Sequence, residues 1–158
     1  MSGTSFCRER QNSFLLKEIK SNKEFMVYGL PSGMLASNIS WSPSETKVAF
    51  TNTVGNRVDL YIIDIQAQRA TKVNRSPLNA TLGTVYIWID DQTLLYKAAT
   101  QPANMAPQKP IVPKGPTIQE NLGKAAPSVT YQDLIKSPHD EALFEFYTTA
   151  QMILNKNG

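Results

Sequence analysis

The chain has 158 residues, of which 41% are hydrophobic, with a formal net charge of +3 at pH 7 and a single cysteine. This length is enough for one globular domain. No apolar run approaches the roughly 20 residues that a membrane helix needs, and the basic residues do not form the stripe typical of nucleic-acid binders. We therefore expect neither a membrane nor a nucleic-acid partner. Cys7 alone excludes an intrachain disulfide and a cysteine-based metal site.

The first 22 residues are polar and weakly patterned, with an apolar stretch at 14–16 that predicts a short strand or one helical turn. Residues 24–29 (EFMVYG) predict a strand, because the segment is rich in residues that suit a pleated surface. Four short strands with tight turns between them are then expected at 37–41, 47–53, 59–65 and 70–73. Strands at this spacing predict an antiparallel meander.

Consecutive apolar residues mark the two central strands of this meander. Val48, Ala49 and Phe50 are adjacent, and residues 60–63 (LYII) are also apolar. A sheet with one wet face alternates apolar and polar residues, so both faces of this sheet are expected to be covered. Blades of a β-propeller have this property, although sandwiches and helix-covered sheets share it.

An internal repeat favours the propeller. The segment 84–98 reads TVYIWIDDQTLLYKA, and Trp88 stands 47 residues after Trp41. In this alignment Asp90-Asp91-Gln92 replaces the turn at 43–45, and 94–96 replaces 48–50. The interval is close to the ~40–45 residues of a four-stranded blade.

The rhythm then breaks at a proline-rich segment. Residues 100–127 hold six of the ten prolines, and proline cannot donate to a strand ladder. Two short helices are predicted at 130–136 and 139–147, followed by a strand at 150–154. The final Asn157-Gly158 is a hairpin signal, so we expect a returning strand to be missing and the chain to be a segment of a larger ring.

The predicted fold is therefore mainly β. It consists of about two blades of a truncated β-propeller, built from four-stranded antiparallel meanders, with a proline-rich insertion and two short helices. The expected organisation is an N-terminal polar segment at 1–22 and a partial propeller at 23–158. The first blade covers about 36–73 and the second about 84–158, with an insertion at 99–148.

Several segments carry a family resemblance. WSPSETKVAFTN followed by DLYIIDI resembles the WSPDG-type blade of TolB-like propellers, with Ser44-Glu45 in place of the usual Asp-Gly. SPLNATLG (76–83), VPKGPTIQENLGKAAP (112–127) and TYQDLIKSPHDEALFEFYTTAQ (130–151) together resemble the N-terminal propeller of glutamyl endopeptidases. These belong to the prolyl oligopeptidase family of serine peptidases. Val129 stands where relatives are expected to carry a basic residue.

This resemblance implies a serine peptidase of two parts, and it assigns the chain to the part that does not catalyse. The propeller would cover a C-terminal α/β-hydrolase domain and restrict which peptide substrates enter. By analogy the compartment would be periplasmic, although the single cysteine suits the cytosol equally, and no signal peptide is visible at 1–5. No cofactor is implied.

The residues themselves favour the same non-catalytic interpretation. The sequence contains no G-x-S-x-G motif, which a serine hydrolase of this type needs. His139 is the only histidine and has no evident nucleophile and acid to work with. One His and one Cys cannot supply a zinc site. Asp90 and Asp91 are interpreted as turn residues, because adjacent carboxylates on a turn point apart.

Two residues are predicted to bind substrate. Arg75 and Asn79 lie in the connection between the blades, and an arginine could hold an acidic side chain through a bidentate contact. A solvated loop arginine is the competing interpretation. The alternative for the whole chain is a stand-alone β-rich module that binds partners, or a second copy of itself, through open strand edges.

Overall fold

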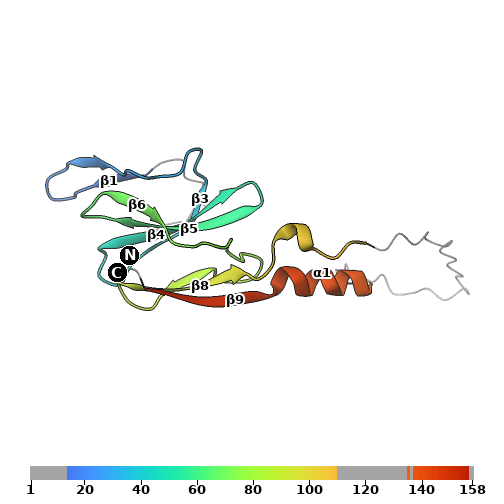
Figure 1. Cartoon of the computed structure of the whole chain (residues 1–158). Helices are drawn as coiled ribbons and strands as arrows, with labels where there is room; N and C mark the ends of the chain where they lie inside the picture. The colour runs from blue at the N-terminus through green and yellow to red at the C-terminus, as the bar shows by residue number, and fades with distance from the viewer. Residues whose placement is uncertain (1–13, 110–134, 136, 157–158) are drawn as a thin grey trace, which may run out of the picture.

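The computed structural model describes residues 14–109, 135 and 137–156 (Figure 1). This part of the chain forms three antiparallel sheets, one α-helix and a short 3-10 helix. The strands are β1 (Leu15–Lys17), β2 (Glu24–Met26), β3 (Ala36–Trp41), β4 (Lys47–Val54), β5 (Arg57–Asp64), β6 (Arg69–Lys72), β7 (Tyr86–Trp88), β8 (Thr93–Ala99) and β9 (Ala150–Lys156). The helices are η1 (Ala103–Met105) and α1 (Pro138–Thr148). The expectation of a mainly β fold is confirmed.

The four-stranded meander has the predicted order, β3-β4-β5-β6. β4 and β5 pair without interruption from Lys47↔Asp64 to Val54↔Arg57. The turn between them contains Gly55 with φ +56°, a conformation that glycine adopts without steric cost. β3 pairs with β4 less regularly, because the register shifts between Ser37 and Ser40.

Both faces of this four-stranded sheet are buried, as the apolar runs predict. Ala49, Leu60 and Ile62 face the sheet β7-β8-β9, in a cluster that we call the inter-sheet core. Val48, Phe50 and Ile63 face the opposite way, toward the β1-β2 hairpin, in a cluster that we call the hairpin core. Figure 1 shows the four-stranded sheet between the other two. A run of consecutive apolar residues is therefore shared between two cores.

The N-terminal end of the described chain contributes to the hairpin core. Phe14 and Leu16 pack against its buried residues, and the ring of Phe14 lies 4.8 Å from that of Phe50. The predicted strand at 24–29 is shorter than expected, since β2 ends at Met26. Beyond it only Tyr28 pairs, through an isolated parallel bridge to Arg69.

The second sheet reproduces the repeat that the sequence predicts. Trp41 pairs with Val48 in the first sheet, and Trp88 pairs with Leu94 in the second. The sheet order is β7-β8-β9, so the strand after the insertion returns beside β8. Leu94, Tyr96 and Ala98 enter the inter-sheet core. On the opposite face Ile87, Met152 and Leu154 are about half exposed.

The equivalent turns of the two repeats touch one another. The backbone N–H of Ser44 donates to Asp91 Oδ1 at 2.7 Å, and Lys47 Nζ donates to Gln92 Oε1 at 2.8 Å. The repeats therefore stack with matching ends side by side. This fixes the relative register of the two sheets at one end of the inter-sheet core.

The predicted helix at 139–147 is confirmed as α1. Ser137 begins it, because its hydroxyl accepts a 3.2 Å hydrogen bond from the Asp140 N–H, and proline is tolerated in the first turn. Among the described residues α1 buries none of its side chains, and it projects away from the sheets in Figure 1. The helix predicted at 130–136 lies outside the described residues, except for Ile135, which is not helical.

Candidate functional site

The connection between β6 and β7, residues 73–85, carries both predicted substrate-binding residues. It crosses from the first sheet to the second and makes backbone hydrogen bonds to both: the Leu78 N–H donates to Val58 O, and the Asn79 N–H donates to Lys97 O. The two predicted residues have different surroundings. Arg75 is exposed, whereas Asn79 is 7% exposed.

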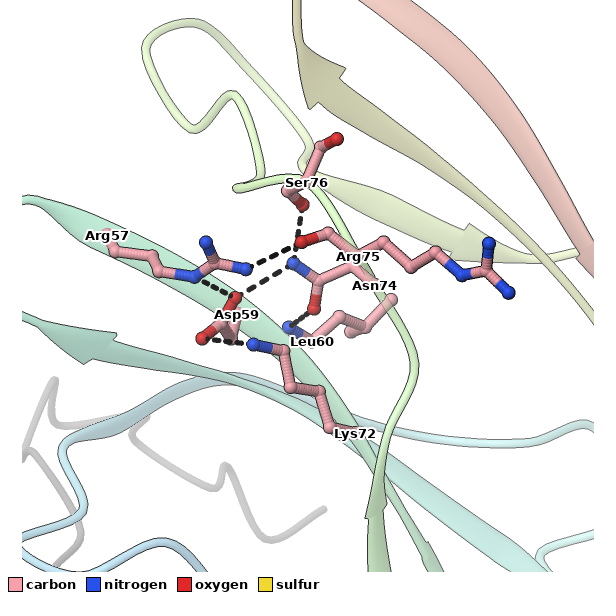
Figure 2. Close-up of polar contacts among 7 residues, drawn as sticks. All are labelled: Arg57, Asp59, Leu60, Lys72, Asn74, Arg75 and Ser76. Carbon is pink, nitrogen blue, oxygen red and sulfur yellow. Dashed lines mark hydrogen bonds and ion pairs between the residues drawn. The ribbon is translucent and has the colours of Figure 1, made fainter. Parts of the chain in front are cut away.

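A polar cluster centred on Asp59 holds the start of this connection (Figure 2). Asp59 accepts hydrogen bonds from Arg57 Nε at 2.7 Å, Lys72 Nζ at 2.9 Å and Asn74 Nδ2 at 2.9 Å. The Oδ1 atom of Asn74 accepts from the Leu60 N–H at 2.7 Å. Strand β5 and the chain after β6 are thus tied together by one buried carboxylate and one buried amide.

The electrostatics of this cluster favour an ionised Asp59. Burial by itself raises the pKa of a carboxyl group, but hydrogen bonds from Lys72, Asn74 and Arg57 outweigh burial here. The pKa of Asp59 therefore lies below its ordinary value. The cluster carries two cationic side chains against one carboxylate, so it is locally positive.

The backbone of Arg75 is held by a hydrogen bond, whereas its side chain is exposed to solvent. Its carbonyl oxygen accepts a 2.8 Å hydrogen bond from Arg57 Nη2, and in Figure 2 its guanidinium extends away from Asp59. Among the described residues, that guanidinium has no hydrogen bond or ion pair. Burial raises the pKa of Tyr96, and the positive charge of Arg75 opposes this increase. Arg75 thus presents an unpaired cation near the edge of the inter-sheet core.

The side-chain amide of Asn79 has two N–H donors, and both are already used within the chain. Its Nδ2 donates to Tyr147 O and to Thr149 O, both at 2.9 Å. Its Oδ1 accepts from the Thr81 N–H at 3.1 Å. The side chain therefore anchors the C-terminal end of α1 to the connection. The prediction that Arg75 and Asn79 bind substrate stays a prediction, and the geometry gives the two residues different roles.

A cavity of about 300 Å³ lies beside Asn79. Its apolar lining comes from four distant parts of the chain and includes Val58, Leu78, Ala99, Phe146 and Tyr147. Asn56 and Gln101 contribute polar side chains to it. Sequence reasoning did not find this cavity, because no local pattern marks residues that only the tertiary fold brings together.

Asp90 and Asp91 lie in the turn between β7 and β8. Hydrogen bonds from the Gln92 N–H and the Thr93 hydroxyl lower the pKa of Asp90, and contacts with Ser44 lower that of Asp91. His139 is the second residue of α1. Within residues 14–109, 135 and 137–156, no group of three or more His, Cys, Asp or Glu side chains is placed to hold a metal ion. No helix in the same ranges has the length and apolarity to cross a membrane.

Comparison with known proteins relates the chain to peptidases. No protein-family model matches it. It is 34% identical over 142 residues, 83% of its length, to a protein of Oryza sativa subsp. japonica named probable glutamyl endopeptidase, chloroplastic. It is 30% identical over 149 residues, 89% of its length, to a protein of the same name from Arabidopsis thaliana. The chain spans 15% of the length of each of these curated relatives.

Proposed function

We propose that this chain is a non-catalytic partial β-propeller of a glutamyl endopeptidase-like serine peptidase, which covers a hydrolase domain and restricts the access of peptide substrates. The similarity to two proteins named probable glutamyl endopeptidase carries this proposal, because it extends over 83% and 89% of the chain. The matched part is only 15% of those proteins. A role for this chain in their activity is therefore part of the proposal.

The arrangement of the two repeats supports a propeller role. Each propeller blade packs one face on the preceding blade and the other on the next. The four-stranded sheet is covered on both faces, and one cover is a sheet with the same Trp–turn–strand pattern. The hydrogen bond between Ser44 and Asp91 joins equivalent turns, which is the contact expected when repeats stack side by side.

The chemistry of the sequence supports a role without catalysis. A serine nucleophile in an α/β-hydrolase needs the strained G-x-S-x-G turn and an oxyanion hole beside it, and the 158 residues contain no such motif. In the proposal the reactive serine belongs to a separate domain. The isolated chain is then expected to cleave no peptide.

Arg75 is the residue of this chain that we propose to meet substrate. Its guanidinium is exposed and unpaired within the described residues, while its carbonyl is held by Arg57 at 2.8 Å. An arginine whose backbone is held and whose guanidinium is unpaired suits a bidentate contact with a carboxylate. An acidic substrate side chain is therefore the proposed ligand. Asn79 would position the connection rather than contact the substrate, since its amide donors are already used.

A chimaera tests the proposal directly. The chain would replace the matched 142-residue segment of the Oryza sativa relative, and cleavage of peptides with and without Glu would be measured for the chimaera and for the isolated chain. We expect activity on Glu-containing peptides only in the chimaera. Arg75→Ala should then raise KM for these peptides about tenfold or more, whereas Arg69→Ala, a second exposed arginine, should not. A folded but inactive chimaera, or an active isolated chain, would contradict the proposal.

A second candidate function is a β-rich interaction module that binds through open strand edges. The long unpaired edge of β9 in the described structure favours it. Light scattering of the isolated chain over a range of concentrations separates this candidate from a strict monomer.

A further inference from the structure

The sheet edges of this protein are protected unequally. Proteins usually blunt an exposed edge with a bulge, a short strand or a covering segment, because unpaired backbone groups recruit other strands. At the β3 edge the register is irregular between Ser37 and Ser40. At the β6 edge, Tyr28 covers the strand, since its N–H donates to Gln68 O and its carbonyl accepts from the Ala70 N–H. β7 is only three residues long.

The edge of β9 has none of these protections among the described residues. β9 runs for seven residues, Ala150–Lys156, and pairs with β8 in unbroken register. Its sequence, AQMILNK, contains no proline and only one charge, at its last position. No described strand lies on its other side. Figure 1 shows β9 at the outer edge of its sheet.

The residues of β9 are complementary to a second copy of themselves. If two β9 strands pair antiparallel about Ile153, then Met152 lies opposite Leu154 of the other copy, and Gln151 lies opposite Asn155. Paired residues in an antiparallel ladder share a face. Met152 and Leu154 are both on the outer face and are 57% and 56% exposed, so each would cover an apolar neighbour. Ala150 lies opposite Lys156, so no like charges meet.

Asn155 provides an independent reason for this register. Its Oδ1 is buried and accepts no hydrogen bond from the described residues, and a buried acceptor without a partner destabilises the folded chain. In the two-fold pairing the residue directly opposite is Gln151, which is exposed and whose side-chain amide is a donor. The pairing places a donor beside each of the two Asn155 side chains.

We propose that the isolated chain forms a two-fold dimer by antiparallel pairing of β9 with β9 of a second copy, centred on Ile153, to give a continuous six-stranded sheet. This inference concerns the chain by itself and does not depend on the peptidase proposal; it gives the second candidate function a defined edge and partner. The contact is small, so we expect a weak dimer with a dissociation constant of roughly 1–100 μM.

Light scattering and sedimentation across that concentration range measure the association. Leu154→Lys places a cation at the paired edge, opposite Met152 of the other copy, and should weaken the dimer at least about tenfold. Ile87→Lys is the matched control, because Ile87 lies on the same face in β7 and is 47% exposed. An equal loss for the control would show stacking of sheet faces and overturn the edge pairing, as would a strict monomer at every concentration.

Disulfide trapping tests the register. In a Cys7→Ser background, Met152→Cys and Leu154→Cys chains would be mixed and oxidised. Directly opposite Cα atoms lie about 4.5–5.5 Å apart, within disulfide reach, whereas the diagonal positions are about 7–8 Å apart. We expect the mixture to cross-link and each single variant to remain largely uncross-linked. Equal cross-linking in all three samples would overturn the proposed register.

Discussion

The hydroxyl of Tyr86 lies 2.9 Å from the carbonyl oxygen of Ala49, so a side chain of the second sheet reaches the backbone of the first. The same hydroxyl donates to the Asn38 carbonyl and lies 2.9 Å from Ser40 Oγ. Tyr86 is 7% exposed. One phenol of the second sheet thus contacts polar groups of β3 and β4, and the contact with the Ala49 carbonyl is buried, where an unpaired carbonyl would be costly.

Replacing Tyr86 with Phe should therefore destabilise the contact between the two sheets. The change leaves the Ala49 and Asn38 carbonyls without this donor, and we expect a loss of about 1–3 kcal/mol in the free energy of unfolding. Urea denaturation at pH 7 measures it. Tyr28→Phe is the control, since Tyr28 is 65% exposed and its change should cost less than about 0.5 kcal/mol.

The same variant should alter the alkaline dependence of stability. Burial raises the pKa of Tyr86 from 10.0 to about 12. Between these values Tyr86 is deprotonated in the unfolded chain and still protonated in the folded chain. The stability that Tyr86 contributes is therefore fully present below pH 10 and falls as the pH rises toward 12. The advantage of the native chain over Tyr86→Phe should shrink by about 3 kcal/mol across this window. If the difference in unfolding free energy between the two chains stayed constant from pH 10 to 12, the raised pKa of Tyr86 would be contradicted.

Asp59 should make stability sensitive to acid. Its folded-state pKa lies below the ordinary 3.8, because hydrogen bonds from Lys72, Asn74 and Arg57 outweigh burial. A depressed carboxyl pKa contributes stability that is present above the unfolded value and is lost as pH falls through the folded value. Asp59→Asn should cost about 1–3 kcal/mol at pH 7, and the difference from the native chain should diminish below about pH 4.

The control for Asp59 is a surface ion pair. Lys17 and Glu24 approach to 3.5 Å, and about half of each side chain is exposed. Such pairs contribute about 0–1 kcal/mol, so Glu24→Gln should change the unfolding free energy little at pH 7. Equal effects of the two substitutions would show that the Asp59 cluster does not hold the connection in place.

Asn79 should control the attachment of α1. An aspartate at this position cannot donate to Tyr147 O or Thr149 O and would face both carbonyls with negative charge. We expect Asn79→Asp to destabilise the end of α1 by about 2–3 kcal/mol, seen as faster amide exchange at 145–150. Asn56→Asp makes the same change at an exposed residue that lines the same cavity, and exchange there should stay close to that of the native chain.

The sequence predicted the strands of the meander well because their signals are local. The runs at 48–50 and 60–63 indicated burial on both faces, and the Trp–turn–strand repeat indicated a second sheet with the same pairing, one residue shorter at its turn. Period and turn chemistry act over a few residues, so they can be read without a structure.

The site was harder to predict because its contacts are distant in the chain. Arg75 and Asn79 stand four residues apart in one connection, yet one guanidinium is free and the other side chain is bound to carbonyls about 70 residues away. Asp59 gave no signal either, since its partners come from β5, β6 and the chain beyond. Tertiary packing decides which polar side chain is used for structure and which remains available.

Gly29 should be the glycine least tolerant of substitution. It has φ +77°, and a Cβ atom built there would lie 2.6 Å from the carbonyl oxygen of Ala70, a backbone atom that cannot move aside easily. Gly29→Ala therefore combines left-handed strain of about 1–2 kcal/mol with a clash against β6. Because the adjacent Tyr28 covers the β6 edge, the variant should also expose that edge.

Gly33→Ala is the matched control, with φ +62° and nothing within 4 Å of its Cβ position, so this variant has the backbone strain without the clash. Thermal unfolding should show a clearly larger loss for Gly29→Ala, accompanied by faster exchange at the amides of β6; equal losses would mean that Tyr28 and β6 are not held as closely as described.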